Sequence, residues 1–143
     1  MKFSVAALLT AAASVSSTFN FEVQGFTASC IPHSTFCNYS FKVIQPNSME
    51  TLKNAVECSA RAQSTDYYLP DIKDAKCKDS SRTFSITRMG KGLGVIISQP
   101  ITPKSDTIGD YLIPMDQLVQ KTENNAQVEV YNGPTSFELT QRN

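Results

Sequence analysis

Apolar and polar residues alternate along much of this chain. Every second residue is apolar in residues 19–24, and the same alternation runs through residues 37–43 and 56–61. Successive side chains of a β-strand point to opposite faces, so this pattern predicts strands with one face on a core and the other in water. The parity places Cys37 and Cys58 on the apolar faces of their strands, where a disulfide would be shielded from solvent.

Turn-forming residues separate further strand candidates at short intervals. The candidates span residues 83–88, 93–98, 110–114, 127–131 and 136–140. The turn segments between strands are Gln45-Pro46-Asn47-Ser48, Met89-Gly90-Lys91-Gly92, Gln99-Pro100 and Asn132-Gly133-Pro134. Their Asn-Gly and Gly-Lys-Gly steps suit the positive φ angles of tight hairpins. Residues 115–120 fit one helical turn. About eight or more short strands spaced in this way predict an all-β fold, a small antiparallel β-barrel or sandwich.

The first 17 residues have a different character. One basic residue, Lys2, precedes the apolar run 5–13, and small residues follow at Ser14, Ser16 and Ser17. This order is typical of a secretory signal peptide. The apolar run is far shorter than the ~20 residues of a membrane-spanning helix. We therefore expect residues 1–17 to be removed and residues 18–143 to form a single secreted, extracellular domain without a membrane anchor.

The charge of the chain bears on its partners. Basic and acidic side chains each number 13, and loss of Lys2 with the signal peptide leaves 12 against 13. No block of like charge occurs, so the sequence offers neither the basic surface that nucleic acids attract nor a polybasic membrane patch. We expect no nucleic-acid partner.

The four cysteines all lie in the predicted secreted domain. An even number of cysteines behind a signal peptide indicates disulfides. Of the three connectivities, Cys30–Cys37 and Cys58–Cys77 are favoured, because each pair encloses a short segment that contains a turn. A zinc site is the competing interpretation, but no Cys pair has zinc-finger spacing and His33 is the only histidine. No metal or cofactor is expected.

Residues for catalysis are sparse. A hydrolase that uses a nucleophile needs a base, and His33 lies between Pro32 and Ser34 in the smaller predicted disulfide loop, a position that suits a turn better than a proton relay. Four carboxylates that could form a glycosidase pair occur in one stretch: Asp66, Asp71, Asp74 and Asp79. Lysines and a proline are interspersed among them, as in a solvated loop. The sequence therefore favours a protein that is not an enzyme, with a carboxylate-pair hydrolase as the alternative.

One modification site is predicted. Asn38-Tyr39-Ser40 is an N-glycosylation sequon. The alternation places Asn38 on the polar side of its strand, where a glycan could be carried. The tripeptide is common by chance, and the adjacent Cys37 can slow glycan addition, so both outcomes remain open at this point.

Two further clusters are candidates for contact with a partner. Tyr67 and Tyr68 lie between Cys58 and Cys77, and aromatic residues on a loop held at both ends could anchor a partner at low entropic cost. The alternative is that one of the tyrosines closes the end of the core. Arg82, Arg88 and Lys91 could contact an acidic partner or could be scattered surface charge.

Several stretches resemble a family of small secreted fungal proteins. Phe26-Thr27-Ala28-Ser29-Cys30-Ile31-Pro32-His33-Ser34 and the following Cys37-Asn38-Tyr39-Ser40-Phe41 resemble the N-terminal signature of hypersensitive-response-inducing elicitors. Residues 56–60, Cys77 and residues 84–86 are similar to the cysteine-bounded hairpin region of the Alternaria major-allergen-like family, and residues 109–114, 131–134 and Phe137 also fit the elicitor pattern.

The resemblance implies a compact antiparallel β-barrel without known catalytic activity. It also implies a role in plant defence or cell-death responses, binding to host proteins and, in the allergen branch, flavonoid-type ligands and disulfide-linked dimers. The favoured pairing leaves no spare thiol here, so a covalent dimer is not expected.

The leading hypothesis is therefore a secreted fungal effector or elicitor that binds a host extracellular protein or small ligand, in the apoplast if the fungus lives on plants. A cell-wall-directed carbohydrate-binding or hydrolytic protein and an extracellular inhibitor of host hydrolases are the alternatives.

Overall fold

The computed structural model describes residues 19–46 and 48–142, so the predicted signal peptide lies outside the described residues. The described residues form ten strands and one turn of 3-10 helix. In chain order these are β1 (Phe19–Cys30), β2 (Phe36–Ile44), β3 (Val56–Gln63), β4 (Ile72–Lys76), β5 (Thr83–Met89), β6 (Gly92–Thr102), β7 (Ser105–Pro114), η1 (Met115–Gln117), β8 (Leu118–Glu123), β9 (Ala126–Tyr131) and β10 (Phe137–Gln141). The prediction of an all-β fold is confirmed.

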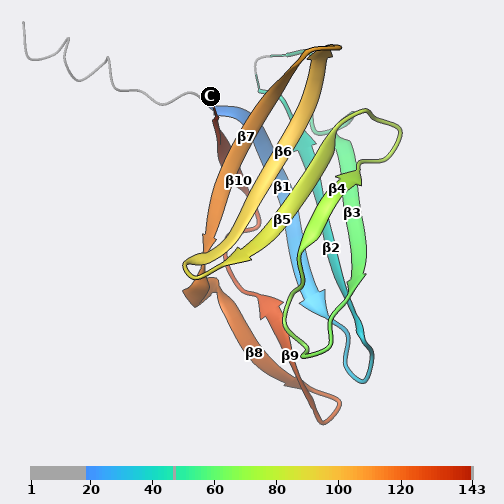
Figure 1. Cartoon of the computed structure of the whole chain (residues 1–143), viewed down its shortest axis with the longest axis vertical. Helices are drawn as coiled ribbons and strands as arrows, with labels where there is room; N and C mark the ends of the chain where they lie inside the picture. The colour runs from blue at the N-terminus through green and yellow to red at the C-terminus, as the bar shows by residue number, and fades with distance from the viewer. Residues whose placement is uncertain (1–18, 47, 143) are drawn as a thin grey trace, which may run out of the picture.

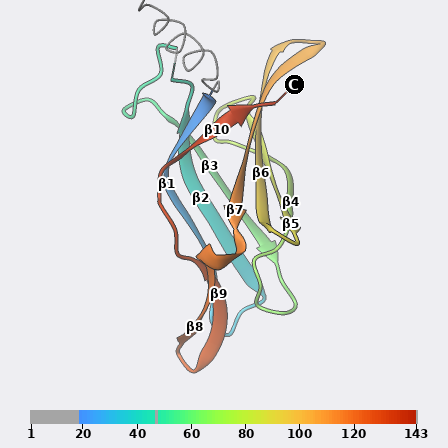
Figure 2. The same ribbon diagram turned by 90° about the vertical axis from the view of Figure 1, so that its left-hand side faces the viewer.

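Eight of the strands form an antiparallel, nearly closed barrel in the order β3-β2-β1-β10-β7-β6-β5-β4 (Figure 1). The hairpin of β8 and β9 lies off this path and joins the barrel where Val130 of β9 pairs with Ser29 of β1. Figure 2 shows the hairpin extending beyond one end of the barrel. The sequence predicted a barrel or a sandwich, and the structure is the barrel.

The barrel closes between β3 and β4 through a disulfide instead of a strand ladder. Cys58 of β3 is bonded to Cys77, which directly follows β4. Beside this bond the backbone N–H of Lys78 donates to the carbonyl of Glu57 at 2.8 Å. The disulfide thus holds together the two strands at the ends of the sheet order.

The second disulfide joins Cys30 and Cys37, which face each other on β1 and β2. The favoured connectivity is confirmed. The four cysteine side chains are at most 3 % exposed, so the inward parity predicted for Cys37 and Cys58 is also confirmed. All four cysteines are used within the chain. Two shielded disulfides are consistent with an extracellular protein.

A bulge at Gly25 lets β1 run for 12 residues although its alternation changes phase. Gln24 pairs with Lys42 and Thr27 pairs with Ser40, so β1 has one residue more than β2 over this interval. Gly25 has φ 66°, the left-handed region that favours glycine. Phe21 and Val23 therefore point inward before the bulge, and Phe26, Ala28 and Cys30 do so after it.

Aromatic rings fill the barrel interior. The ring of Phe26 lies within 6.5 Å, centroid to centroid, of four others, those of Tyr39, Phe41, Tyr131 and Phe137. Phe41 continues the contact across the barrel to Phe84 of β5 with an edge-to-face geometry at 5.0 Å. Such pairs add to the stabilisation that burial of the rings provides. The bulge that turns Phe26 inward therefore supplies the centre of the core.

The structure departs from the predicted strands in three places. β4 and β8 replace stretches expected to be loop or helical turn, and only residues 115–117 of the predicted turn are helical. β6 continues through Pro100 to Thr102, where it pairs with β7 in a long hairpin arm. The proline is tolerated because this part of the hairpin lies beyond the neighbouring strands β5 and β10.

The turns also differ from expectation. The Asn132-Gly133 step forms no hairpin, and in the Gly-Lys-Gly turn only Gly92 has a positive φ, of 148°. The tight turn with two left-handed residues is Asn124-Asn125, between β8 and β9, with φ 50° and 67°. Asparagine accepts this conformation more readily than most residues.

Candidate functional site

The loop between β3 and β4, residues 64–71, covers one end of the barrel and is called here the cap loop. Figure 1 shows it in green beside the β8–β9 hairpin. Its start is fixed to the β1–β2 turn, because the N–H of Ser64 donates to the carbonyl of Thr35 at 2.6 Å. Within the loop, the Ser64 hydroxyl lies 2.6 Å from the carbonyl of Tyr68, and the N–H of Tyr68 donates to Asp66 Oδ1 at 3.1 Å.

A buried carboxylate attaches the cap loop to β9. Glu129 is 4 % exposed and its Oε1 accepts the N–H of Leu69 at 2.7 Å. The backbone N–H of Glu129 donates to the carbonyl of Tyr67 at 3.0 Å. Arg88 forms an ion pair with Glu129 and also donates to the carbonyl of Leu69. The charge of Glu129 is therefore matched by a guanidinium, as a buried carboxylate requires.

The far end of the cap loop is fixed from inside and outside the barrel. The hydroxyl of the buried Tyr39 donates to the carbonyl of Pro70 at 2.8 Å, and burial raises the pKa of this phenol, so it remains a donor. On the outside, Asp71 Oδ1 accepts the backbone N–H of Arg88 at 2.8 Å. The loop is thus held at its start, middle and end.

These bonds hold Tyr67 in an unfavourable backbone conformation. Its φ is 63°, in the left-handed region that bulky residues avoid. Such positions cost on the order of 1–3 kcal/mol and are concentrated at sites of function. The carbonyl of Tyr67 is the group bonded to Glu129. The conformation is therefore maintained by a contact with β9 and not by the tyrosine ring.

Both tyrosine side chains lie on the surface. Tyr67 is 39 % exposed and Tyr68 is 44 % exposed, while Leu69 between them and the core is 1 % exposed. Leu69, and not a tyrosine, closes the end of the core. The guanidinium of Arg88 lies 5.6 Å from the centre of the Tyr68 ring. A recess of about 290 Å³ adjoins this ring, with Gln63, Pro70 and Asp71 among its lining residues.

A charged residue also orders the cap loop. The pKa of Asp66 is lowered, first by the hydrogen bond from the N–H of Tyr68 and then by that from the Ser64 hydroxyl. The charged form of Asp66 therefore favours the observed loop conformation. Phe36 directly follows Thr35, whose carbonyl accepts the N–H of Ser64 at the start of the loop. Phe36 is 37 % exposed, and the guanidinium of Arg61 lies 5.7 Å from its ring centre.

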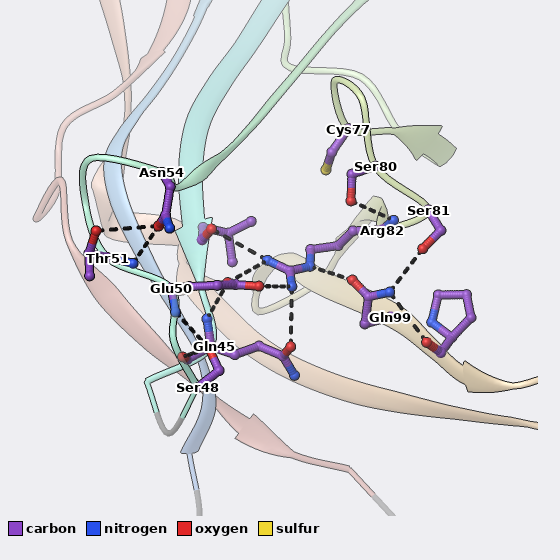
Figure 3. A network of polar contacts seen from close by, with 12 residues as sticks. Gln45, Ser48, Glu50, Thr51, Asn54, Cys77, Ser80, Ser81, Arg82 and Gln99 are labelled. Carbon is purple, nitrogen blue, oxygen red and sulfur yellow. Dashed lines mark hydrogen bonds and ion pairs between the residues drawn. The ribbon is translucent and has the colours of Figure 1, made fainter.

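Arg82, directly before β5, is buried near the opposite end of the barrel. It is 2 % exposed and its guanidinium lies 5.3 Å from the ring centre of Phe21. Figure 3 shows it surrounded by acceptors. Nε donates to Gln99, and the two terminal nitrogens donate to the carbonyl of Val43 and to the side chains of Gln45 and Glu50. This group is called the Arg82 cluster.

Glu50 brings the segment between β2 and β3 into the Arg82 cluster. Burial alone would raise the pKa of this carboxyl, but the hydrogen bonds from Arg82 and from the N–H of Gln45 lower it overall. The suggestion that Arg82, Arg88 and Lys91 form one surface for an acidic partner is therefore wrong. Arg82 is inside, and Arg88 is engaged by Glu129.

The other candidates have separate places. Asp74, with φ 49°, lies at the bulge of β4 near Ser85, and Asp79, with φ 52°, lies in the turn after Cys77. His33 has φ 58° in the β1–β2 turn, as its sequence position suggested, and its Nε2 contacts the carbonyl of Asn124. Asn38 lies on the outer side of β2. Within the described residues, no group of three or more His, Cys, Asp or Glu is placed to hold a metal ion.

The described part contains no helix with the length and apolar character that a membrane crossing requires. The chain matches no model of a known protein family and no curated protein.

Proposed function

We propose that this protein is a secreted, non-enzymatic effector of the elicitor type, which binds a host extracellular protein through Tyr67 and Tyr68 of the cap loop. The observation that carries the proposal is the combination of two exposed aromatic rings with a backbone fixed by buried groups. Partner binding then orders little additional chain, which favours affinity. Tyrosines are also common among the residues that dominate binding energy at protein interfaces.

The carboxylates support binding over hydrolysis. Asp66 accepts hydrogen bonds within the cap loop and Asp71 accepts the N–H of Arg88. Glu129 and Glu50, the partly or fully buried carboxylates of the two barrel ends, are each paired with an arginine. These carboxylates stabilise loops, and this structural role explains their positions without a role in hydrolysis.

The test is partner recovery from plant apoplastic fluid. The secreted protein is immobilised, and bound proteins are compared with those retained by the Tyr67→Ser/Tyr68→Ser double variant. We expect the wild type to retain one or a few host proteins and the variant to retain at least tenfold less.

The matched control is Tyr111→Ser, because Tyr111 lies on β7 and stacks on Phe137 away from the cap loop. This control should keep the wild-type partner if it remains folded by circular dichroism. Equal retention by wild type and double variant would show that the cap loop is not the binding surface.

A further inference from the structure

The outer face of β1, β2 and β3 is polar and contains a hollow. Cross-strand pairs place Ser40 beside Ser59 and Lys42 beside Glu57, all on the outer side. A groove of about 410 Å³ lies over these residues and Gly25. Leu52, from the segment between β2 and β3, is 57 % exposed and forms part of its lining.

The hollow has a local cause. Gly25 has no side chain, and nothing lies within 4 Å of the place where a Cβ would be. Ser40 and Ser59 have short side chains, so the floor is low over three adjacent strands. The segment that carries Leu52 is held against the barrel by Glu50 and the Arg82 cluster. The groove is therefore a fixed feature of the fold.

The groove has the chemistry to contact a sugar. Hydroxyls of Ser40 and Ser59, the ammonium of Lys42 and the carboxylate of Glu57 provide both donors and acceptors. Among the hydrogen bonds of the described residues, these four side chains take part in none. Leu52 offers an apolar surface for the C–H groups of a sugar ring. The opposite charges of Lys42 and Glu57 suit a neutral ligand better than an ionic one.

Asn38 lies next to the groove on the same face. It is two residues before Ser40 on β2, a distance of about 7 Å along a strand. Nε of Arg61 donates to Asn38 Oδ1 at 3.0 Å. Within the described residues no hydrogen bond uses Asn38 Nδ2, the atom that bears the sugar in an N-linked glycan. The sequon therefore has its attachment atom free beside an open polar groove.

We propose that Asn38 carries an N-linked glycan whose core sugars lie in the groove over Ser40 and Ser59. In the secretory pathway, Asn38 Nδ2 attacks the anomeric carbon of a lipid-linked oligosaccharide. The new N–C bond replaces the bond to the lipid pyrophosphate, which leaves, and Nδ2 loses one proton. Transfer precedes folding, because in the barrel β2 is paired on both sides. The proposal shares with the proposed function only the requirement for secretion.

The first experiment tests for the glycan. The full chain is secreted from a eukaryotic host, and its mass is measured before and after peptide N-glycosidase treatment. We expect a loss of at least a core glycan in the wild type and in Ser40→Thr, which keeps the sequon. Asn38→Gln and Ser40→Ala should give the unmodified mass throughout. An unmodified wild-type mass in secreted protein would overturn the proposal.

The second experiment tests whether the core sugars of the glycan lie in the groove. Ser59→Tyr fills the groove and leaves the sequon intact, and Thr140→Tyr places the same side chain at an exposed position of β10. Glycosidase release from the folded protein should be at least tenfold faster in Ser59→Tyr than in wild type or Thr140→Tyr, with equal rates after reduction and denaturation. Equal release rates for all three folded proteins would show that the core sugars do not lie in the groove.

A third measurement separates this proposal from the cap-loop proposal. Asn38→Gln should retain the apoplastic partner that requires Tyr67 and Tyr68. Loss of the glycan with retention of the partner shows that the two sites are independent. Loss of the partner in Asn38→Gln would contradict this independence, since the glycan would then contribute to the cap-loop interface.

Discussion

Arg82 and Glu129 are the two most deeply buried charged residues described, and each connects a loop to the barrel. Arg82 brings the segment that contains Glu50 to one end, and Glu129 brings the cap loop to the other. Loops generally have more conformational freedom than the strands they connect. At the residue scale, buried charges are therefore what gives this protein defined surfaces outside its strands.

Replacement of Arg82 should be costly. In Arg82→Met the carboxylate of Glu50, the amide oxygens of Gln45 and Gln99 and the carbonyl of Val43 lose the hydrogen bonds from the guanidinium. Because Glu50 can be partly rehydrated, we expect a loss of about 2–4 kcal/mol in the free energy of unfolding. Urea denaturation with intact disulfides measures it. The control is Arg142→Met, since Arg142 is exposed and 3.9 Å from Asp110. It should lose less than about 1 kcal/mol, and similar losses for both variants would contradict the account.

Tyr67→Gly should separate stability from binding. Glycine removes the left-handed strain, worth about 1–2 kcal/mol, but adds about 1 kcal/mol of unfolded-state entropy. The free energy of unfolding should stay within about 1 kcal/mol of wild type, while partner retention is lost. Tyr68→Gly has no such strain to relieve and loses the contact with Arg88, so it should be less stable than Tyr67→Gly. The reverse order in urea denaturation would mean that Tyr67 is not strained.

The Arg82 cluster also predicts a response to acid. The pKa of Glu50 is lower in the folded protein than its ordinary value of 4.5. Its contribution to stability is therefore complete above about pH 4.5 and is lost as the pH falls through the lower folded value. Unfolding free energies measured from pH 6 to pH 2 should fall more steeply for wild type than for Glu50→Gln. Parallel curves would show that this carboxylate is not stabilised by Arg82.

At the scale of the elements, the bulge in β1 joins two segments whose apolar residues alternate in opposite phase, so that both segments belong to one strand. Without the extra residue, either Phe21 and Val23 or Phe26 and Ala28 would face water, because a shift of one residue exchanges the two faces of a strand. The structure buries all four. The bulge also provides the floor of the outer groove, so one glycine serves both the core and the surface.

Alanine substitutions should show that φ is what requires glycine here. No atom lies within 4 Å of a Cβ built at Gly25 or at Gly90, and only Gly25 has a positive φ. Gly25→Ala should therefore lose about 1 kcal/mol, whereas Gly90→Ala should be neutral or slightly stabilising. The comparison is made by thermal or urea unfolding. Equal effects at the two positions would refute the backbone explanation.

Sequence patterns predicted the elements with strong alternation and missed the weak ones. Residues 37–43 and 56–61 alternate clearly and form β2 and β3. β4 has only Ile72 and Ala75 as inward residues around a bulge, and β8 has no buried residue. Short strands with so little apolar content resemble loops in sequence. The alternation of apolar and polar residues changes phase at Gly25 in the sequence. Such a change also fits the end of a strand, so it does not by itself predict a bulge.

The candidate site was predictable only in part. Tyr67 and Tyr68 were found because aromatic residues stood out between two cysteines. The sequence did not predict the contacts that hold the cap loop, because Leu69 and Glu129 are 60 residues apart and Arg88 and Glu129 are 41 residues apart. Such distant pairs depend on the order of the strands. For the same reason the sequence does not reveal that Arg82 lies inside the barrel, where it is 2 % exposed.

At the scale of the whole molecule, the barrel presents two separate surfaces. One is the cap loop at a barrel end, with its exposed tyrosines, and the other is the polar outer face of β1, β2 and β3 with its groove. The two disulfides lie toward opposite ends of the barrel. Cys30–Cys37 fixes the turn that the first residue of the cap loop contacts, and Cys58–Cys77 joins β3 to the end of β4 near Arg82. Reduction should therefore loosen the cap loop together with the barrel.

The cap-loop proposal is tested most directly by the response of infiltrated leaf tissue to purified secreted protein. A dose series of wild type, Tyr67→Ser/Tyr68→Ser and reduced, alkylated protein is scored for cell death or defence activation. We predict a response to wild type, at least a tenfold higher dose for the double variant, and none for the reduced protein. A double variant that is as potent as wild type, or a wild type without any response, would contradict the account.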